Sequence, residues 1–220
     1  MTIQNNLKKI YSEFPEHVSL VAVSKTKPVS DILEAYQAGQ RVFGENKVQE
    51  MCDKQPGLPN DIRWHLIGHL QRNKVKYIAS FVELIHGVES LRLLKEIDKQ
   101  AKKHNRVINC LLQIYIAEEE TKFGLNEQEL EEIINSEEFK QLENIKIVGF
   151  MGMATFTDDD EKIRKEFAYL KSLFDKYQPL NRTNLQLDTL SMGMSGDYRI
   201  AVECGSNMVR IGSSIFGSRA

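Results

Sequence analysis

The sequence has little cysteine, no excess of positive charge and no long apolar run. Its 220 residues include three cysteines, Cys52, Cys110 and Cys204, which lie far apart and form no C-x-x-C pair. This spacing gives no sign of a disulfide framework or of a cysteine zinc site, and it fits the reducing cytoplasm. No activating histidine or lysine lies beside any of them, so we interpret all three as small apolar residues.

Charge and hydropathy exclude two classes of partner. The 29 Lys and Arg residues nearly balance the 31 Asp and Glu residues, so the formal net charge is −2 and no basic block attracts nucleic acid. No apolar run approaches the roughly 20 residues that a membrane-spanning helix needs. Residues 1–11 lack the apolar centre of a secretion signal and have the spacing of a short amphipathic helix. We expect a cytoplasmic protein that binds neither nucleic acid nor membranes.

Short apolar segments alternate with longer helical patterns along the whole chain. Eight segments are predicted as strands: residues 18–23, 41–43, 62–67, 82–86, 107–116, 145–151, 185–190 and 208–211. Several are apolar at nearly every position, as expected of parallel strands that are covered on both faces. This alternation is typical of a β/α fold.

Helical patterns fill the intervals between the predicted strands. One opens at Ser30, one runs through residues 90–97, one is capped by Asn126 and one covers residues 158–177. Eight repeats favour a closed (β/α)8 barrel of TIM type, with the additional N-terminal helix, over an open doubly wound sheet. Barrels of this kind commonly form one domain of this size, so we predict a single domain over residues 1–220.

Lys25 lies directly after the first predicted strand. TIM-type barrels carry their active sites at the carboxyl ends of the strands, so this position is a candidate for chemistry. Desolvation, with repulsion from Lys27, would lower the pKa of Lys25 and leave a neutral amine able to form a Schiff base. Most lysines are solvated surface groups, and from this feature alone that interpretation is the stronger one.

Two Gly/Ser clusters follow the seventh and eighth predicted strands. The first contains Ser195, which we expect to cap a helix that runs through Ala201, and the second contains Gly212 and Ser213. Phosphate sites recur on this fold in the loops after these two strands, so the pair of clusters predicts an anion site. Ordinary turn chemistry is the alternative.

Three further residues lie at or near the predicted active face. Arg210 stands inside the last strand, where alternate residues point into a barrel, and a charge there needs a partner. His65 and His69 are four residues apart, but the first lies in a strand and the second beyond a glycine, so they do not predict a zinc pair. We interpret His65 as a pocket-wall residue. Asn46 follows the second strand, where it could equally belong to a simple strand-to-helix turn.

Taken together, these segments resemble the pyridoxal-phosphate homeostasis proteins, also called the YggS or PROSC family. Those proteins share a barrel with the N-terminal domain of alanine racemase. The matching segments span nearly the whole chain: VAVSKTKP at 21–28, FGEN at 43–46, VQE at 48–50, WHLIG at 64–68, LQ at 70–71, NK at 73–74, MGMA at 151–154, SMGMS at 191–195 and MVRIG at 208–212. Their order and spacing are far more specific than one lysine or one glycine cluster.

The resemblance implies a cofactor, pyridoxal 5′-phosphate, and a site for it. Lys25 would hold the cofactor as a Schiff base, and Arg210 would face the pyridine nitrogen. Asn46 and His65 would be pocket residues. The phosphate would be bound by the two Gly/Ser clusters, at Ser195, Gly212 and Ser213. Many relatives carry threonine in place of Ser213, and either residue supplies a hydroxyl donor.

Two functions would use this cofactor. The first is that of a carrier, which holds pyridoxal phosphate and delivers it to apo pyridoxal-phosphate enzymes through transient contacts. The second is that of an amino-acid racemase. Racemisation needs a base on each face of the substrate carbanion, and the racemase relatives bring one base from a C-terminal domain. The sequence ends nine residues after its last predicted strand, so we expect no such domain, although Tyr115 or Tyr198 could substitute. We therefore predict a monomeric carrier without a metal.

Overall fold

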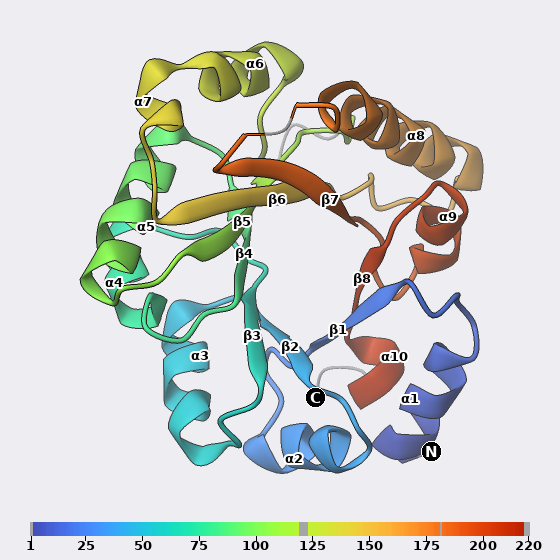
Figure 1. Ribbon diagram of the computed structural model, residues 1–220. Coiled ribbons are helices and arrows are strands. Elements are labelled where there is room, and N and C mark those ends of the chain that lie inside the picture. The colour runs from blue at the N-terminus through green and yellow to red at the C-terminus, as the bar shows by residue number, and fades with distance from the viewer. Residues whose placement is uncertain (1, 119–122, 181, 218–220) are drawn as a thin grey trace.

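Eight parallel strands close into a barrel in the computed structural model, which describes residues 2–118, 123–180 and 182–217 (Figure 1). The strands are β1 (Ser19–Val23), β2 (Val42–Glu45), β3 (Arg63–Leu66), β4 (Leu84–Val88), β5 (Ile108–Gln113), β6 (Ile145–Met151), β7 (Leu185–Ser191) and β8 (Met208–Ile211). Each strand pairs with the next along the chain, and β8 pairs with β1. The predicted TIM-type barrel is therefore confirmed, and the largest difference in bounds is at β5, which was expected to reach Ile116.

Helices form a layer outside the ring of strands (Figure 1). They are α1 (Ile3–Tyr11), α2 (Val29–Gln37), α3 (Val48–Lys54), α4 (Val75–Ile78), α5 (Leu91–Lys103), α6 (Glu127–Asn135), α7 (Glu137–Lys140), α8 (Asp160–Tyr177), α9 (Tyr198–Glu203) and α10 (Ser213–Phe216), with short 3-10 turns at Gln55–Gly57 and Arg72–Lys74. Asn126 caps α6 as predicted: its side chain accepts the N–H of Glu129 at 2.9 Å, and the Glu129 carboxylate accepts the N–H of Asn126 at 2.9 Å. This reciprocal pair satisfies two N–H groups that the helix itself leaves unpaired.

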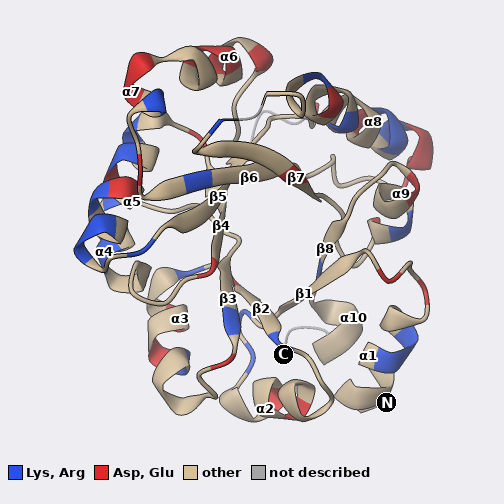
Figure 2. Cartoon of the chain, in the orientation of Figure 1, with Lys and Arg blue, Asp and Glu red and all other residues tan. Residues whose placement is uncertain are grey.

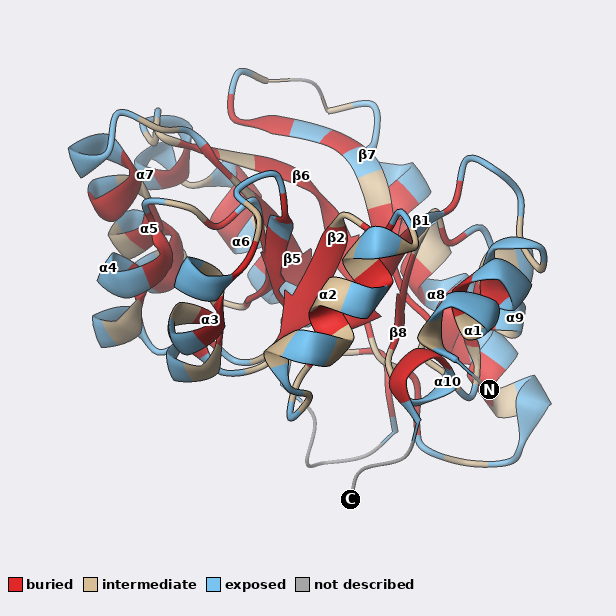
Figure 3. Cartoon of the chain, turned by 90° about the horizontal axis from the view of Figure 1, so that it is seen from below, coloured by how far each residue is buried: buried red, intermediate tan, exposed pale blue. Residues whose placement is uncertain are grey.

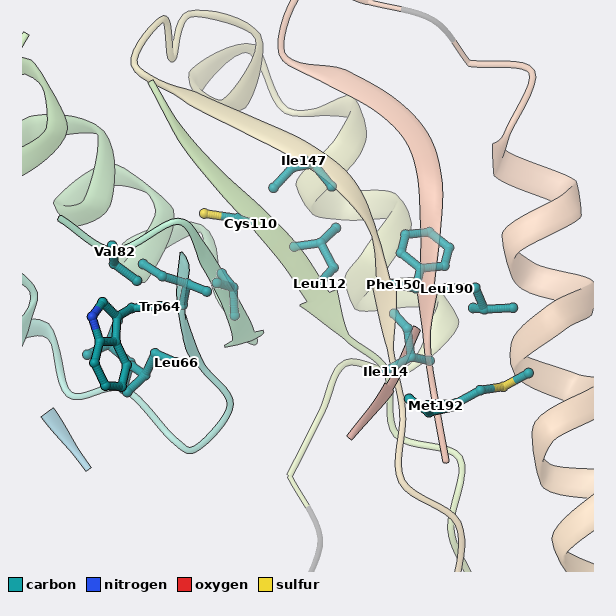
Figure 4. Packing of buried hydrophobic residues seen from close by; sticks show 14 of the residues in the cluster. Trp64, Leu66, Val82, Cys110, Leu112, Ile114, Ile147, Phe150, Leu190 and Met192 are labelled. Atoms are coloured by element: carbon teal, nitrogen blue, oxygen red, sulfur yellow. The ribbon is translucent and has the colours of Figure 1, made fainter. Parts of the chain in front are cut away.

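The strands are apolar because most of them are buried on both faces (Figure 3). In β5, Cys110 and Leu112 belong to the main core between the strands and the helices, part of which Figure 4 shows, whereas Leu111 belongs to a second cluster with Leu84 and Val148. Alternate residues of a strand point to opposite faces, so the second cluster lies inside the barrel. A polar or charged residue that points inward must therefore find its partners within the ring of strands.

The amphipathic N-terminal helix is confirmed as α1, which lies beside α10 in the outer layer (Figure 1). Leu7 and Ile10 are buried on its inner side. Asn6 Nδ2 donates to the carbonyl oxygen of Ile215 at 2.8 Å. The N-terminal segment is thereby attached to the helix that follows the last strand.

Charged residues lie mainly on the helices and their connections, as the colours in Figure 2 show. The longest helix, α8, has 18 residues and carries charges along its length. No helix within the described ranges combines the length and the apolar composition that crossing a membrane requires.

Candidate functional site

A cavity of about 770 Å³ lies at the carboxyl ends of the strands. It falls in the size range of small-molecule sites, roughly 300–1,000 Å³. Six of the seven predicted site residues line it: Lys25, Asn46, Ser195, Arg210, Gly212 and Ser213. A smaller hollow of about 460 Å³, around Arg72 and Arg92, contains none of the seven. The barrel topology therefore brings together residues that the sequence scatters over nearly its full length.

Lys25 reaches the cavity from the point where the chain leaves β1. The N–H of Ser24 still donates to Gly44 in β2 at 3.0 Å, so sheet pairing continues to that residue. Thr26 then adopts a φ of 64°, which turns the chain away from the sheet. Lys25 stands between these two residues, half-buried, and it lines the cavity together with Lys27.

Arg210 points into the barrel from β8, as predicted, and is 4% exposed. Its guanidinium donates to the carbonyl oxygen and the hydroxyl of Ser191 at 2.8 and 2.7 Å, and to the carbonyl oxygen of Gly152 at 3.0 Å. Burial lowers the pKa of Arg210 to about 10, although Asp197 acts to raise it. The side chain therefore stays a cation at neutral pH, and uncharged acceptors hold it in place in the cavity lining.

His65 is the one predicted site residue outside the described lining of the cavity. Its Nδ1 lies 3.0 Å from Nε2 of His86, and Nδ1 of His86 lies 3.2 Å from the hydroxyl of Ser191, which also accepts from Arg210. Burial lowers the pKa of His65 to about 3 and that of His86 well below its usual value. Both rings are therefore neutral, and His65 is connected to Arg210 through two intervening side chains.

The two Gly/Ser loops meet, but Ser195 does not cap a helix as expected. The helix α9 begins at Tyr198, with Asp197 in the N-cap position. The carboxylate of Asp197 accepts the N–H of Met194 at 2.5 Å, which closes a turn before the helix and moves its start beyond Ser195. The Ser195 hydroxyl instead accepts the N–H of Gly212 at 3.2 Å. This hydrogen bond joins the loop after β7 to the loop after β8.

Asn46 follows β2 and lines the cavity. Its backbone lies close to Gly68, in the loop after β3. A Cβ at Gly68 would lie 2.3 Å from the carbonyl oxygen of Asn46, so only glycine permits this approach. Gln113 and Met153 also line the cavity. Sequence reasoning missed Gln113, whereas Met153 belongs to the segment 151–154 that the family resemblance picked out but was not assigned to the site. Gln113 is the one polar residue in the otherwise apolar run of residues 110–114, and that is a signal that could have indicated it.

The described lining carries more positive than negative charge. Three basic side chains, Lys25, Lys27 and Arg210, line the cavity, against the single acidic side chain of Asp197. This balance favours an anionic ligand. Among the residues that the structure describes, no cluster of three or more His, Cys, Asp or Glu side chains could hold a metal ion.

Comparison with known proteins identifies the family. The family described as alanine racemase, N-terminal domain, matches residues 1–220. The pyridoxal phosphate homeostasis protein of Pasteurella multocida is 38% identical over 234 residues, which cover 100% of this chain and 98% of that protein. The protein of the same name from Escherichia coli K12 is 38% identical over 209 residues, covering 93% and 87% of the two chains.

Solved structures agree with this family. PipY of Synechococcus elongatus, solved with PLP bound, is 35% identical and has a TM-score of 0.89, covering 98% of this chain and 100% of that chain. An alanine racemase of Clostridium difficile is 19% identical with a TM-score of 0.79, and the match covers 56% of that longer chain, so it shows the fold alone. The full-length match to the family and to its named members shows that the chain belongs to the pyridoxal phosphate homeostasis proteins.

Proposed function

We propose that this protein binds pyridoxal 5′-phosphate (PLP) in the cavity, as a Schiff base with Lys25, and holds it for intracellular homeostasis and delivery. One observation carries the proposal: a lysine at a strand end, a buried arginine and two linked Gly/Ser loops all line the same cavity. The PLP-bound structure of the relative PipY supports the choice of ligand.

The lining residues fit the parts of this cofactor. Lys25 offers an amine, and the hydroxyls of Ser195 and Ser213, with the backbone at Gly212, would hold the phosphate. PLP supplies an aldehyde for an amine and a ring that withdraws electrons. We assign Asn46 to the cavity wall. We assign His65 to the buried side chains that support Arg210, because the His65 ring is linked to Arg210 through His86 and Ser191.

Arg210 is suited to holding the pyridine ring without activating it. Arginine has donors only and remains charged, so it can hydrogen-bond an unprotonated nitrogen but does not readily give it a proton. The carbonyl oxygens of Ser191 and Gly152 fix the guanidinium in that role. The chemistry of amino acids that depends on a protonated ring would therefore be suppressed.

The geometry gives less support to the alternative, an amino-acid racemase. Neither tyrosine considered as a second base belongs to the described lining of the cavity. The Tyr198 hydroxyl donates to the carboxylate of Glu13, and Tyr115 lines a separate hollow beside Glu129. Neither tyrosine is therefore placed to act as the second base that removal and return of a proton on two faces requires.

Delivery implies that another protein can approach the cofactor. Phe123 and Phe156 line the cavity and are 63% and 95% exposed, so two aromatic side chains stand at an open mouth. We propose that apo PLP enzymes contact this side transiently, and that the protein acts in the cytoplasm as a monomer of one domain.

The proposal is tested with the purified protein loaded with PLP. We expect a visible absorption band of a Schiff base that borohydride bleaches, with the reduced adduct on Lys25 by mass spectrometry. The loaded protein should restore activity to an apo PLP enzyme. Reactivation should be faster than with free PLP at the concentration that dissociates from the loaded protein. Steady racemisation of amino acids at ordinary enzyme rates, of order 1–10³ per second, would contradict the carrier function, and absence of the adduct would contradict the site.

A further inference from the structure

A buried ion-pair network lies between α3 and the ends of β1 and β2, directly beside Lys25. Lys54 is 8% exposed and Glu45 is fully buried, although sequence alone would place both at the surface. The Lys54 ammonium donates to Glu45 Oε1 at 2.9 Å and to Glu50 Oε1 at 2.7 Å. Its third hydrogen bond goes to the backbone carbonyl of Ser24 at 2.8 Å. All three donors of the ammonium are thereby used.

The network holds the backbone on both sides of Lys25. On one side, the carbonyl of Ser24 accepts from Lys54, while the Ser24 hydroxyl donates to Glu45 at 2.6 Å. On the other side, the N–H of Thr26 donates to the same Glu50 oxygen at 2.5 Å. Both peptide units that flank Lys25 are therefore restrained, and with them the direction in which its side chain leaves the chain.

The backbone at Thr26 requires such restraint. Its φ of 64° lies in the left-handed region, which is strained for a β-branched residue. The hydrogen bond to Glu50 offsets this strain in the folded state. If the bond were lost, Thr26 would relax toward an ordinary φ and the preceding lysine would turn with it.

The charges of the network act as a unit. Burial raises the pKa of Glu45, against the opposing effects of Lys54 and Ser24. Burial also acts to raise the pKa of Glu50, but hydrogen bonds from Lys54 and from Thr26 outweigh it, so the net change is downward. Lys54 is the cation that two acidic side chains share, and removing it would leave both carboxylates without their main partner.

We propose that Lys54, Glu50 and Glu45 form a positioning clamp that presents the amine of Lys25 to the cavity. The inference rests on the proposed function, because it takes Lys25 as the residue that captures the cofactor. The clamp residues are not part of the described cavity lining, so they act through Lys25 and not on the ligand itself. They should therefore affect covalent attachment of the cofactor to Lys25 and not binding of its phosphate.

A double-mutant cycle separates these two contributions. Lys54→Met is made in the wild-type chain and in a Lys25→Ala chain, and PLP affinity and the rate of borohydride-trappable adduct formation are measured. In the wild-type chain, we expect Lys54→Met to slow adduct formation at least tenfold. In the Lys25→Ala chain, where only noncovalent binding remains, Lys54→Met should change PLP affinity less than twofold.

Three comparisons complete the design. Lys165→Met removes an exposed i,i+4 partner of Glu161 on α8 and should leave both readouts unchanged. Glu50→Gln keeps the shape of the side chain and an acceptor oxygen, so it provides a milder variant if Lys54→Met does not fold. Lys54→Arg, which restores the positive charge, should recover part of the lost rate.

The outcomes distinguish the clamp from the site. An equal loss of affinity in both backgrounds would show a general structural role and overturn the clamp, as would an unchanged adduct rate in both Lys54→Met and Glu50→Gln. Failure of the wild-type chain to form an adduct on Lys25 would instead overturn the proposed function on which the clamp depends.

Discussion

Arg210 combines contacts inside the barrel with a place in the cavity lining. Its guanidinium is buried and makes three hydrogen bonds to Ser191 and Gly152, while the same side chain lines the cavity. Any substitution therefore alters the barrel interior and the cavity together. Variants must be compared by stability and by ligand binding before either effect is interpreted.

We expect Arg210→Glu to weaken PLP binding at least tenfold and to destabilise the fold. A carboxylate there would face the carbonyl oxygens of Ser191 and Gly152, leaving buried acceptors unpaired at about 1–3 kcal/mol each. A protonated acid beside the pyridine nitrogen would also raise single-turnover transamination per bound cofactor. Calorimetric titration and single-turnover pyridoxamine-phosphate formation measure these effects, with exposed Arg92→Glu as the control. Unchanged affinity and chemistry together would place Arg210 away from the ring nitrogen.

We expect Lys25→Ala to abolish the Schiff-base absorption and borohydride-stable attachment while leaving weak noncovalent binding. The alanine removes the amine but none of the proposed phosphate contacts on the loops after β7 and β8. Lys27→Ala is the matched control, because Lys27 lines the same cavity and its loss should leave the adduct in place. Absorption spectra and mass spectrometry of reduced protein report the result. A trapped adduct on another lysine in Lys25→Ala would refute the assignment.

Some of these residues could be identified from the sequence and some could not. Barrel geometry marked Lys25 and Arg210 as candidates at or inside a strand end, but for Lys25 only the family resemblance outweighed the interpretation as a solvated surface lysine. Glu45 and Lys54 were not found as buried partners, because burial of a charge depends on a contact between distant segments: Lys54 reaches the carbonyl of Ser24, 30 residues away. The i,i+4 spacing of Glu50 and Lys54 was the one local signal.

At the scale of elements, the loop after β3 determines where the end of β2 can lie. Gly68 packs on the backbone of Asn46, and Gly87 in β4 packs in turn on Gly68, where an added Cβ would lie 2.8 Å from the Gly68 carbonyl oxygen. Two glycines thus allow three neighbouring segments to approach at the cavity wall. The same contact limits how far Asn46 can move.

We expect Gly68→Ala to lower both the unfolding free energy and the affinity for PLP. The new methyl group would meet backbone atoms of Asn46, so the wall must shift, at a cost of roughly 1–3 kcal/mol typical of overpacking. Gly57→Ala is the matched control, because an added Cβ there meets nothing within 4 Å. Denaturant titration and cofactor binding test both effects. A Gly68→Ala protein as stable as Gly57→Ala, with unchanged affinity, would contradict the packing argument.

The bounds of β6 and β8 were more predictable than the start of the short helix α9. The observed bounds of β6 and β8 coincide with the prediction, since their apolar runs are set by burial along the whole strand. The start of α9 was wrong by two residues, because Ser195 and Asp197 are both good capping residues. Ser195 instead contacts Gly212, and Asp197, which accepts the N–H of Met194, takes the N-cap position.

At the scale of the whole molecule, two buried neutral histidines make the fold sensitive to acid. The pKa of His65 is lowered to about 3 and that of His86 is lowered as well, both mainly by burial. A depressed folded-state pKa gives stability that is fully present above the unfolded value near 6.5. This stability is lost as the pH falls toward the folded value, because the unfolded chain then binds the additional protons.

We therefore expect the unfolding free energy of the apo-protein to fall between pH 6.5 and pH 4.5, by on the order of 1.4 kcal/mol per pH unit for each histidine. Glu45, whose pKa is raised by burial, opposes this trend over the same interval. His86→Gln keeps a donor and an acceptor but cannot titrate, so it should flatten the pH dependence relative to wild type. His17→Gln, at an exposed position, should not. Equal slopes in all three proteins would exclude the buried pair as the cause.

Closure of the barrel through β8 and β1 has a consequence for the order of events during synthesis. Lys25 and Arg210 are 185 positions apart in the sequence, yet their strands pair, with Val21 opposite Arg210. β8 is the last of the eight strands to leave the ribosome, so a nascent chain already carries the lysine proposed to bind PLP but not the arginine or the final Gly/Ser loop. An unfinished chain should therefore retain little PLP. Full occupancy becomes possible only when the ring is complete, which makes the bound cofactor a marker of finished folding.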